Sequence, residues 1–232
     1  ITIKPLLSIW GFRQKSQSQI PTSPKIKETK AHVGYQKLIW EGNLLIKRDP
    51  LIELDCDGIA QGYSVDQLAT FINSKGIYNY QIELGGEIYV KGKMAEDQFW
   101  KTRVDMLDEK AQPKEQNLAL DNEAITTSGS FSKFSKLGNQ YFGHIMDPDK
   151  GRPVQNGIIS VSVIAKDAAT ADALDNAFMV MGIDKSMQFL RDKTKIGLYI
   201  IYRTQQGSLK DTANPYFKSK INPSAAALPH WQ

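Results

Sequence analysis

Residues 170–182, TADALDNAFMVMG, form the segment that most restricts how this chain can fold. On a helix Asp172, Asp175 and Asn176 stand at i, i+3 and i+4 and therefore share one face. Most of the remaining surface is apolar, which is typical of a largely buried helix rather than a surface one. Buried carboxylates are costly unless they are paired or bound to a cation, so this narrow polar strip needs an explanation.

Two explanations of the strip stay open from these residues alone. Side chains that offer only oxygen favour Mg²⁺ or Ca²⁺ over Zn²⁺. Alternatively, acids near the start of a helix complement its dipole. The second explanation suits Asp172 better than Asp175 and Asn176, which lie a turn deeper.

Composition excludes several classes of protein. The net charge of +4 over 232 residues, without a basic block interleaved with aromatics, argues against a nucleic-acid partner. No run approaches the roughly 18 apolar residues that predict a transmembrane span. Cys56 is the single cysteine, so no internal disulfide forms, and we interpret it as structural. No signal peptide is visible and the first residue is Ile1, so we expect a fragment or a processed form.

Periodicity and turn residues predict the elements of the first half. We expect a strand or loop over residues 1–12, a surface linker over 13–25 and a short helix near 24–33. Two hairpins are predicted, one around Gly42-Asn43 and one in which Gly85-Gly86 joins NYQIEL to EIYVKGK. Between them we expect a strand at 51–55, the loop CDGIAQG and a helix over about 63–75 that stops at Gly76.

The second half also mixes strands with helices. Strands are expected at FWKTRVDM, in NLALDNEAITTSG, at QYFGHIMD and at IISVSVIAK. The helix of the opening segment follows, capped by Asp167 or Thr170, then a second helix at about 184–193 and a hairpin of GLYIIYRT with LKDTA. Residues 214–232 are rich in Pro, Ala and Lys and predict a loosely held tail. The fold class is α+β, with mixed, mainly antiparallel sheets flanked by helices.

Two glycine-bearing loops are candidate ligand sites. Gly58 and Gly62 precede and open a helix, where free N–H groups and the dipole suit a phosphate; on these residues alone a tight strand-to-helix turn is the favoured alternative. Gly85 and Gly86 permit close backbone approach to a ligand that Glu83 or Glu87 would bind; the alternative is a hairpin bulge.

His144 is the candidate for proton transfer. It precedes an Asp-Pro turn, with Asp147 nearby in sequence and the Ser/Thr-rich turn at residues 126–129 upstream. A carboxylate partner would raise the pKa of this imidazole and suit it to proton transfer. A structural histidine in a strand is the alternative.

Five stretches in this order resemble the ApbE-type FAD:protein FMN transferases: LDCDGIAQGYSVDQLA, IELGGEIYVKG, AITTSGSF, YFGHIMDPDKGRPV and TADALDNAFMVMG. PLLSIWGF near the start also fits. The resemblance implies an ApbE-like (T-fold-like) domain over residues 1–213, followed by the tail at 214–232. It implies that FAD is the substrate, that Mg²⁺ is bound, and that FMN is transferred to a Thr or Ser hydroxyl of a target protein with release of AMP.

The resemblance also assigns site residues. Mg²⁺ would be held by Asp172, Asp175, Asn176 and the backbone carbonyl of Gly58. His144 would be the catalytic general base, with an aspartate as its rival, and Ile145 would line the flavin pocket. The FAD-contacting residues would be Asp55, Gln61, Gly85, Gly86, Glu87, Ser128, His144 and Ile145.

The sequence departs from the family pattern in its Gly loop, which reads DGIAQG where GGIAKG is usual. Gln61 keeps a hydrogen-bonding group but lacks a charge that would pair with phosphate, and Asp57 adds a negative charge. Asn176 stands where Thr is usual. Family members also carry residues ahead of the position that matches Ile1.

Two other functions fit the same site: an FAD pyrophosphatase that yields FMN and AMP, and a non-catalytic FAD-binding protein. By resemblance, we expect the full-length form to be a lipid-anchored protein on the outer face of the cytoplasmic membrane or in the periplasm.

Overall fold

The computed structural model describes residues 1–12, 19–129, 134–137 and 140–221. The chain divides into two compact units, Ile1–Gly58 with Ser130–Gln155 and Ile59–Gly129 with Asn156–Gln232. Each unit has its own hydrophobic cluster. Among the described residues no helix combines the length and the apolar character that crossing a bilayer requires.

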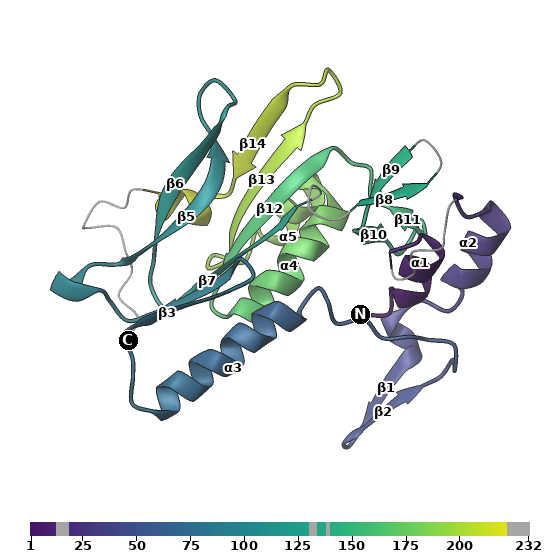
Figure 1. Cartoon of the computed structure of the whole chain (residues 1–232), viewed down its shortest axis with the longest axis horizontal. Helices are drawn as coiled ribbons and strands as arrows, with labels where there is room; N and C mark the ends of the chain where they lie inside the picture. Colours follow the sequence, from purple (N-terminus) through teal and green to yellow (C-terminus); the bar gives the residue numbers. More distant parts are fainter. Residues whose placement is uncertain (13–18, 130–133, 138–139, 222–232) are drawn as a thin grey trace. The chain divides into compact units, whose positions relative to one another are not determined.

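A six-stranded sheet organises the larger unit (Figure 1). Its order is β14-β13-β12-β7-β4-β3, and every neighbouring pair is antiparallel. The strands are β3 (Tyr80–Leu84), β4 (Glu87–Lys91), β7 (Ala124–Gly129), β12 (Ile158–Ala165), β13 (Gly197–Arg203) and β14 (Leu209–Ala213). Together with the helices below, this sheet confirms the α+β class.

Two long helices lie along one face of this sheet (Figure 1). α3 (Ala60–Ser74) contacts β3 and β4, and α4 (Ala168–Met181) contacts β4, β7 and β12 as well as α3. α4 is the predicted buried helix: Asp167 caps it by accepting a hydrogen bond from the Thr170 backbone N–H, and Phe178 is fully buried. α5 (Ile183–Phe189) follows it directly.

The opposite face of the sheet is covered by a β-hairpin and a short helix. β5 (Trp100–Leu107) pairs with β6 (Pro113–Leu120) after the 3₁₀ turn Ala95–Asp97, and α6 (Pro215–Ser219) contacts β13. The cluster between these layers contains Val90, Val104, Leu118, Leu120, Ile125, Ile164, Tyr199, Ile201 and Phe217. Residues that alternate along β4 and β7 therefore point either to this core or to α3 and α4.

The chain after residue 213 is held more firmly than its composition indicated. Asn214 caps α6, and the ring of Phe217 is fully buried and stacked on Tyr199 at 5.3 Å between centroids. Lys220 is 2% exposed, and its Nζ lies 2.6 Å from Oε2 of the buried Glu123. One aromatic anchor and one buried ion pair thus fix residues 214–221, while 222–232 lie outside the described residues.

The smaller unit consists of short elements. They are α1 (Lys4–Ile9), α2 (Ser23–Lys30), the 3₁₀ turn η1 (Tyr35–Lys37), β1 (Leu38–Glu41), β2 (Leu44–Lys47), β8 (Phe134–Leu137), β9 (Gln140–Gly143), β10 (Met146–Asp147) and β11 (Arg152–Pro153). Trp10 lies in the hydrophobic cluster of this unit. Its ring meets that of Phe142 edge-on, with 5.1 Å between the ring centroids, and its Nε1 donates to the carbonyl of Gly151 at 3.0 Å.

Three predictions for this unit were wrong. Residues 4–9 are helical, because burial of Leu6 and Leu7 outweighs the extended preference of the β-branched residues that precede them. Residues 51–55 form no strand. QYFGHIMD is interrupted between β9 and β10, so His144 and Ile145 lie outside both strands.

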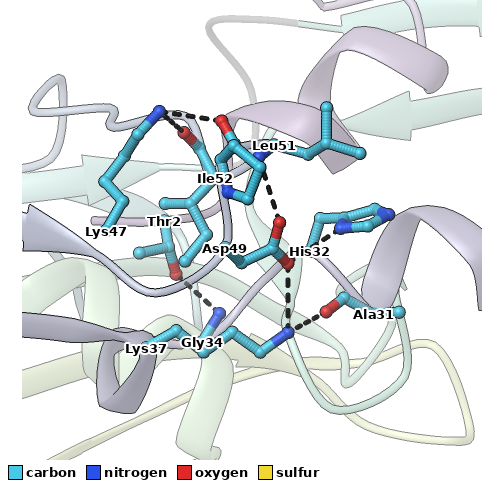
Figure 2. A network of polar contacts seen from close by, with 10 residues as sticks. Thr2, Ala31, His32, Gly34, Lys37, Lys47, Asp49, Leu51 and Ile52 are labelled. Carbon is cyan, nitrogen blue, oxygen red and sulfur yellow. Dashed lines mark hydrogen bonds and ion pairs between the residues drawn. The ribbon is translucent and has the colours of Figure 1, made fainter.

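A polar network around Asp49 explains why the chain after β2 turns rather than extends (Figure 2). Asp49 Oδ2 lies 2.8 Å from Nδ1 of His32 and 3.5 Å from Nζ of Lys37, and the His32 hydrogen bond is the main cause that lowers the pKa of Asp49. Lys47 Nζ donates to the carbonyls of Pro50 and Ile52 at 2.9 and 2.8 Å. These carbonyls are bound by a side chain instead of a strand ladder.

The buried pair of Lys220 and Glu123 makes a stability prediction. Lys220→Met leaves a buried carboxylate without its cation, which costs about 3–5 kcal/mol. Urea unfolding followed by circular dichroism measures the loss. The exposed Lys218 of the same helix provides the control, since Lys218→Met is expected to change stability little. Equal losses in the two variants would show that the pair does not hold the C-terminal segment.

Candidate active site: a buried carboxylate cluster

The starts of α3 and α4 approach each other closely at Gly62. The Gly62 backbone N–H donates to Oδ2 of Asp172 at 2.9 Å. A Cβ at position 62 would lie 2.3 Å from the Ala168 carbonyl oxygen and 2.8 Å from Cβ of Asp172. Glycine is therefore required here so that the helices can approach and the N–H can reach the carboxylate.

A second contact fixes the same pair of helices. Asp66 of α3 accepts hydrogen bonds from the backbone N–H groups of Ala168 and Ala169, both at 2.9 Å. These are donors that the first turn of α4 leaves unsatisfied. α3 therefore supplies both a cap for α4 and a donor for its first acid.

Asp175 is held by strand β7. Its Oδ2 accepts from Oγ1 of Thr126 at 2.8 Å and its Oδ1 accepts from Oγ of Ser128 at 2.9 Å. Ser128 had been assigned to FAD, whereas Thr126 was not among the predicted site residues. The period of two in a strand places 126 and 128 on one face and was the signal that would have identified Thr126.

Asn176 contacts both aspartates through its amide nitrogen. Its Nδ2 lies 3.0 Å from the Asp172 carbonyl oxygen, 3.0 Å from Oδ1 of Asp175 and 3.4 Å from Oδ1 of Asp172. In this arrangement Asn176 donates to the carboxylates instead of offering its oxygen. A half turn of the amide group would present the oxygen, so its role as a cation ligand stays a prediction.

Burial disfavours negative charge throughout the cluster. Asp172 is 4% and Asp175 1% exposed. Burial is the main cause that raises the pKa of Asp172 and that raises the pKa of Asp175 to about 7. For Glu87, burial and then the charges of Asp175 and Asp172 raise the pKa to about 8. Among the described residues no Lys, Arg or His forms an ion pair with any of these three acids.

The donor set fits a hard divalent cation that keeps part of its hydration shell. Within the described ranges no three His, Cys, Asp or Glu side chains gather into a group that would hold a metal unaided. Mg²⁺ does not need such a cage, because proteins usually bind it through one or two carboxylates together with waters and substrate phosphates. Two buried carboxylates without a cationic side chain match that pattern.

Three predicted FAD-contacting residues also lie together. Gly85 and Gly86 form the turn between β3 and β4 with φ of 64° and 99°, values that favour glycine. The Nε2 of Gln61 lies 2.2 Å from where a Cβ of Gly85 would be. The structure thus places Gln61 against the glycine turn, which directly precedes Glu87, the first residue of β4.

Four predicted site residues belong to the smaller unit. Asp55 accepts a hydrogen bond from the Asp57 backbone N–H at 3.0 Å, and Gly58 lies in the turn that precedes α3. Ile145 is buried next to the half-buried His144. The roles of these four residues toward FAD and the cation stay predictions.

Close packing at Gly62 yields a test of the helix pair. In Gly62→Ala the new methyl group would overlap the Ala168 carbonyl, and overpacking of this kind costs about 1–3 kcal/mol. That exceeds the roughly 1 kcal/mol by which alanine is favoured over glycine in a helix. Denaturant unfolding measures the change, with Gly129→Ala as control because its Cβ would lie 3.8 Å from the Ile159 carbonyl oxygen, an ordinary van der Waals distance. A stabilised Gly62→Ala would refute the packing account.

Glu87 makes a pH prediction for the metal-free protein. Its pKa is 4.5 ordinarily and about 8 in the folded protein, so the folded state retains a proton that the unfolded state has lost. Stability should therefore fall as pH rises from about 4.5 to 8. Glu87→Gln cannot ionise and should lessen this fall, so that the variant exceeds the wild type in stability at pH 8. Thermal unfolding in EDTA across this range measures both; parallel profiles would contradict the expectation.

Comparison with known proteins identifies the family. The ApbE family matches residues 1–200. The FAD:protein FMN transferase of Vibrio cholerae serotype O1 is 32% identical over 219 residues, which cover 94% of this chain and 65% of that protein. The Escherichia coli K12 protein of the same name is 32% identical over 225 residues, covering 94% of this chain and 63% of that protein. The chain thus spans somewhat less than two thirds of these relatives.

A solved structure agrees. The flavin transferase ApbE from Vibrio cholerae superimposes with a TM-score of 0.84 at 33% identity and covers 95% of this chain and 70% of its own. A family match over residues 1–200, with relatives and a fold that agree along nearly the whole sequence, establishes that this chain belongs to the ApbE family.

Proposed function

We propose that this chain carries out Mg²⁺-dependent transfer of FMN from FAD to a Thr or Ser hydroxyl of a target protein, with release of AMP. The names of its relatives, FAD:protein FMN transferase, support this assignment. The observation that carries it is the pair of buried acids on α4, Asp172 and Asp175, which no described cationic side chain neutralises.

Asp172 and Asp175 are the residues that would hold the cation. When bound, Mg²⁺ neutralises charge on the diphosphate and on the departing phosphate. The Gly62 N–H fixes one oxygen of Asp172, and the hydroxyls of Thr126 and Ser128 orient Asp175. Side chains fixed in this way need little reorganisation when a ligand arrives.

The proposed reaction is a displacement at phosphorus. The acceptor hydroxyl oxygen forms a bond to the FMN phosphorus of FAD, the bond from that phosphorus to the oxygen of AMP breaks, and AMP leaves with the bonding pair. The hydroxyl proton passes to a general base. We assign that role to His144, with an aspartate as its rival, and we assign FAD contacts to Gln61, Gly85 and Gly86 in the larger unit.

The same resemblance leads us to propose that the full-length protein works outside the cytoplasmic membrane, anchored by lipid. Its acceptor would then be a protein exposed in that compartment. Surface biotinylation of intact cells that produce the full-length form tests this placement, because a cytoplasmic protein would escape the label.

Asp175→Asn is the decisive variant for the function. The protein is incubated with FAD, Mg²⁺ and a Thr-bearing target peptide, and covalent flavin on the peptide is measured by in-gel fluorescence and mass spectrometry. Asp175→Asn is expected to lower the rate by at least about 10²-fold, as removal of one electrostatic stabiliser typically does. The exposed Asp192 supplies the matched control, since Asp192→Asn is expected to keep the wild-type rate.

The products decide between related activities. Flavin attached to the peptide supports the transferase assignment. Free FMN together with AMP, without flavin on the peptide, would show that the chain is an FAD pyrophosphatase instead. FAD that stays bound but unchanged would reduce the chain to an FAD-binding protein. Transfer that is indifferent to EDTA would refute the role of the cation.

A further inference from the structure

Glu87 lies on the sheet face that carries the groups holding Asp175. In the β4–β7 ladder Ile88 pairs with Ile125 and Tyr89 with Ala124. This antiparallel register places Glu87 opposite Thr126, and directly opposed residues share one face of a sheet. Thr126 donates to Asp175 of α4, and α4 contacts both strands. The Glu87 carboxyl is therefore on the α4 side, beside the acid cluster.

The carboxyl of Glu87 has an unmet requirement. The residue is 7% exposed, and its Oε2 is buried with no hydrogen-bond partner among the described residues. Leaving a buried polar atom unsatisfied costs about 1–3 kcal/mol, and more when it is charged. The two α4 acids also have donors from Gly62, Thr126 and Ser128, which Glu87 does not share.

The described acids form no group of three that would hold a metal by themselves. Mg²⁺ releases its waters reluctantly and usually keeps several of them. A water on a cation held by Asp172 and Asp175 carries two polarised O–H donors. Such a donor is what the unpaired Oε2 lacks.

We infer that Glu87 is a positioning residue that accepts a hydrogen bond from a water in the hydration shell of the cation. This inference rests on the cation site of the proposed function. It changes the role predicted for Glu87, which the sequence had assigned to FAD. Groups that hold a ligand of a metal in this indirect way typically contribute 10–100-fold to metal affinity.

Magnesium binding in the absence of FAD tests this role. The midpoint of thermal unfolding is followed as MgCl₂ is added, and the concentration dependence of the shift gives an apparent dissociation constant that does not depend on basal stability. Glu87→Gln is expected to weaken this constant about 10-fold or more. Glu109→Gln is the matched control, because Glu109 is an exposed glutamate in the turn between β5 and β6 to which no site role is assigned, and it should bind as the wild type does.

Two outcomes overturn the inference separately from the function. If the wild type responds to MgCl₂ and Glu87→Gln responds with the same constant, Glu87 does not act on the cation. If pulsed electron paramagnetic resonance with Mn²⁺ in place of Mg²⁺ finds an extra bound water in Glu87→Gln, Glu87 is a direct ligand. An unchanged water count together with weakened binding supports the indirect role. A wild type without any response to MgCl₂ overturns the cation site itself, and with it the proposed function.

Discussion

The burial of carboxylate charge on α4 governs the architecture of the larger unit. A helix with Phe178 and Met179 in the core must lie on the sheet, yet Asp172 and Asp175 enter that interior with it. Their charge is tolerable only where donors or a cation meet them. On the sheet, the hydroxyls of Thr126 and Ser128 donate hydrogen bonds to Asp175, and on α3 the backbone N–H of Gly62 donates to Asp172. The polar strip on an otherwise apolar helix therefore determines both the contents of the neighbouring strand and the close approach of the two helices.

The elements with strong periodicity were predictable, and those fixed by distant contacts were not. The alternation and length of β12, and the apolar stripes of α3 and α4, specify the type of structure locally. The segment 1–12 carries a β-like composition, but the burial of Leu6 and Leu7 makes part of it helical. The C-terminal segment illustrates the same limit, since its composition conceals that Phe217 and Lys220 have buried partners far away in the sequence.

In the candidate site, too, the residues set by local spacing were predictable and those set by distant contacts were not. Asp172 and Asp175 were predictable because helical spacing brings them to one face. The partners that hold them come from positions 110 and about 50 residues away along the chain, for which local pattern provides no signal. Asp66 had no sequence signal at all, as a carboxylate on one helix that caps another is recognised only once both helices are placed.

Gly62 and Asp66 stand one helical turn apart on α3, and both bind the first turn of α4. Gly62 donates to Asp172, and Asp66 accepts from the N–H groups of Ala168 and Ala169. Two points of attachment remove the freedom to slide or rotate that a single hydrogen bond would leave. A movement of the Asp172 carboxylate would therefore act on the backbone at the start of α3, through the hydrogen bond that the Gly62 N–H donates to it. Exchange of the Gly62 amide with deuterium would thus report how tightly the Asp172 carboxylate holds this N–H.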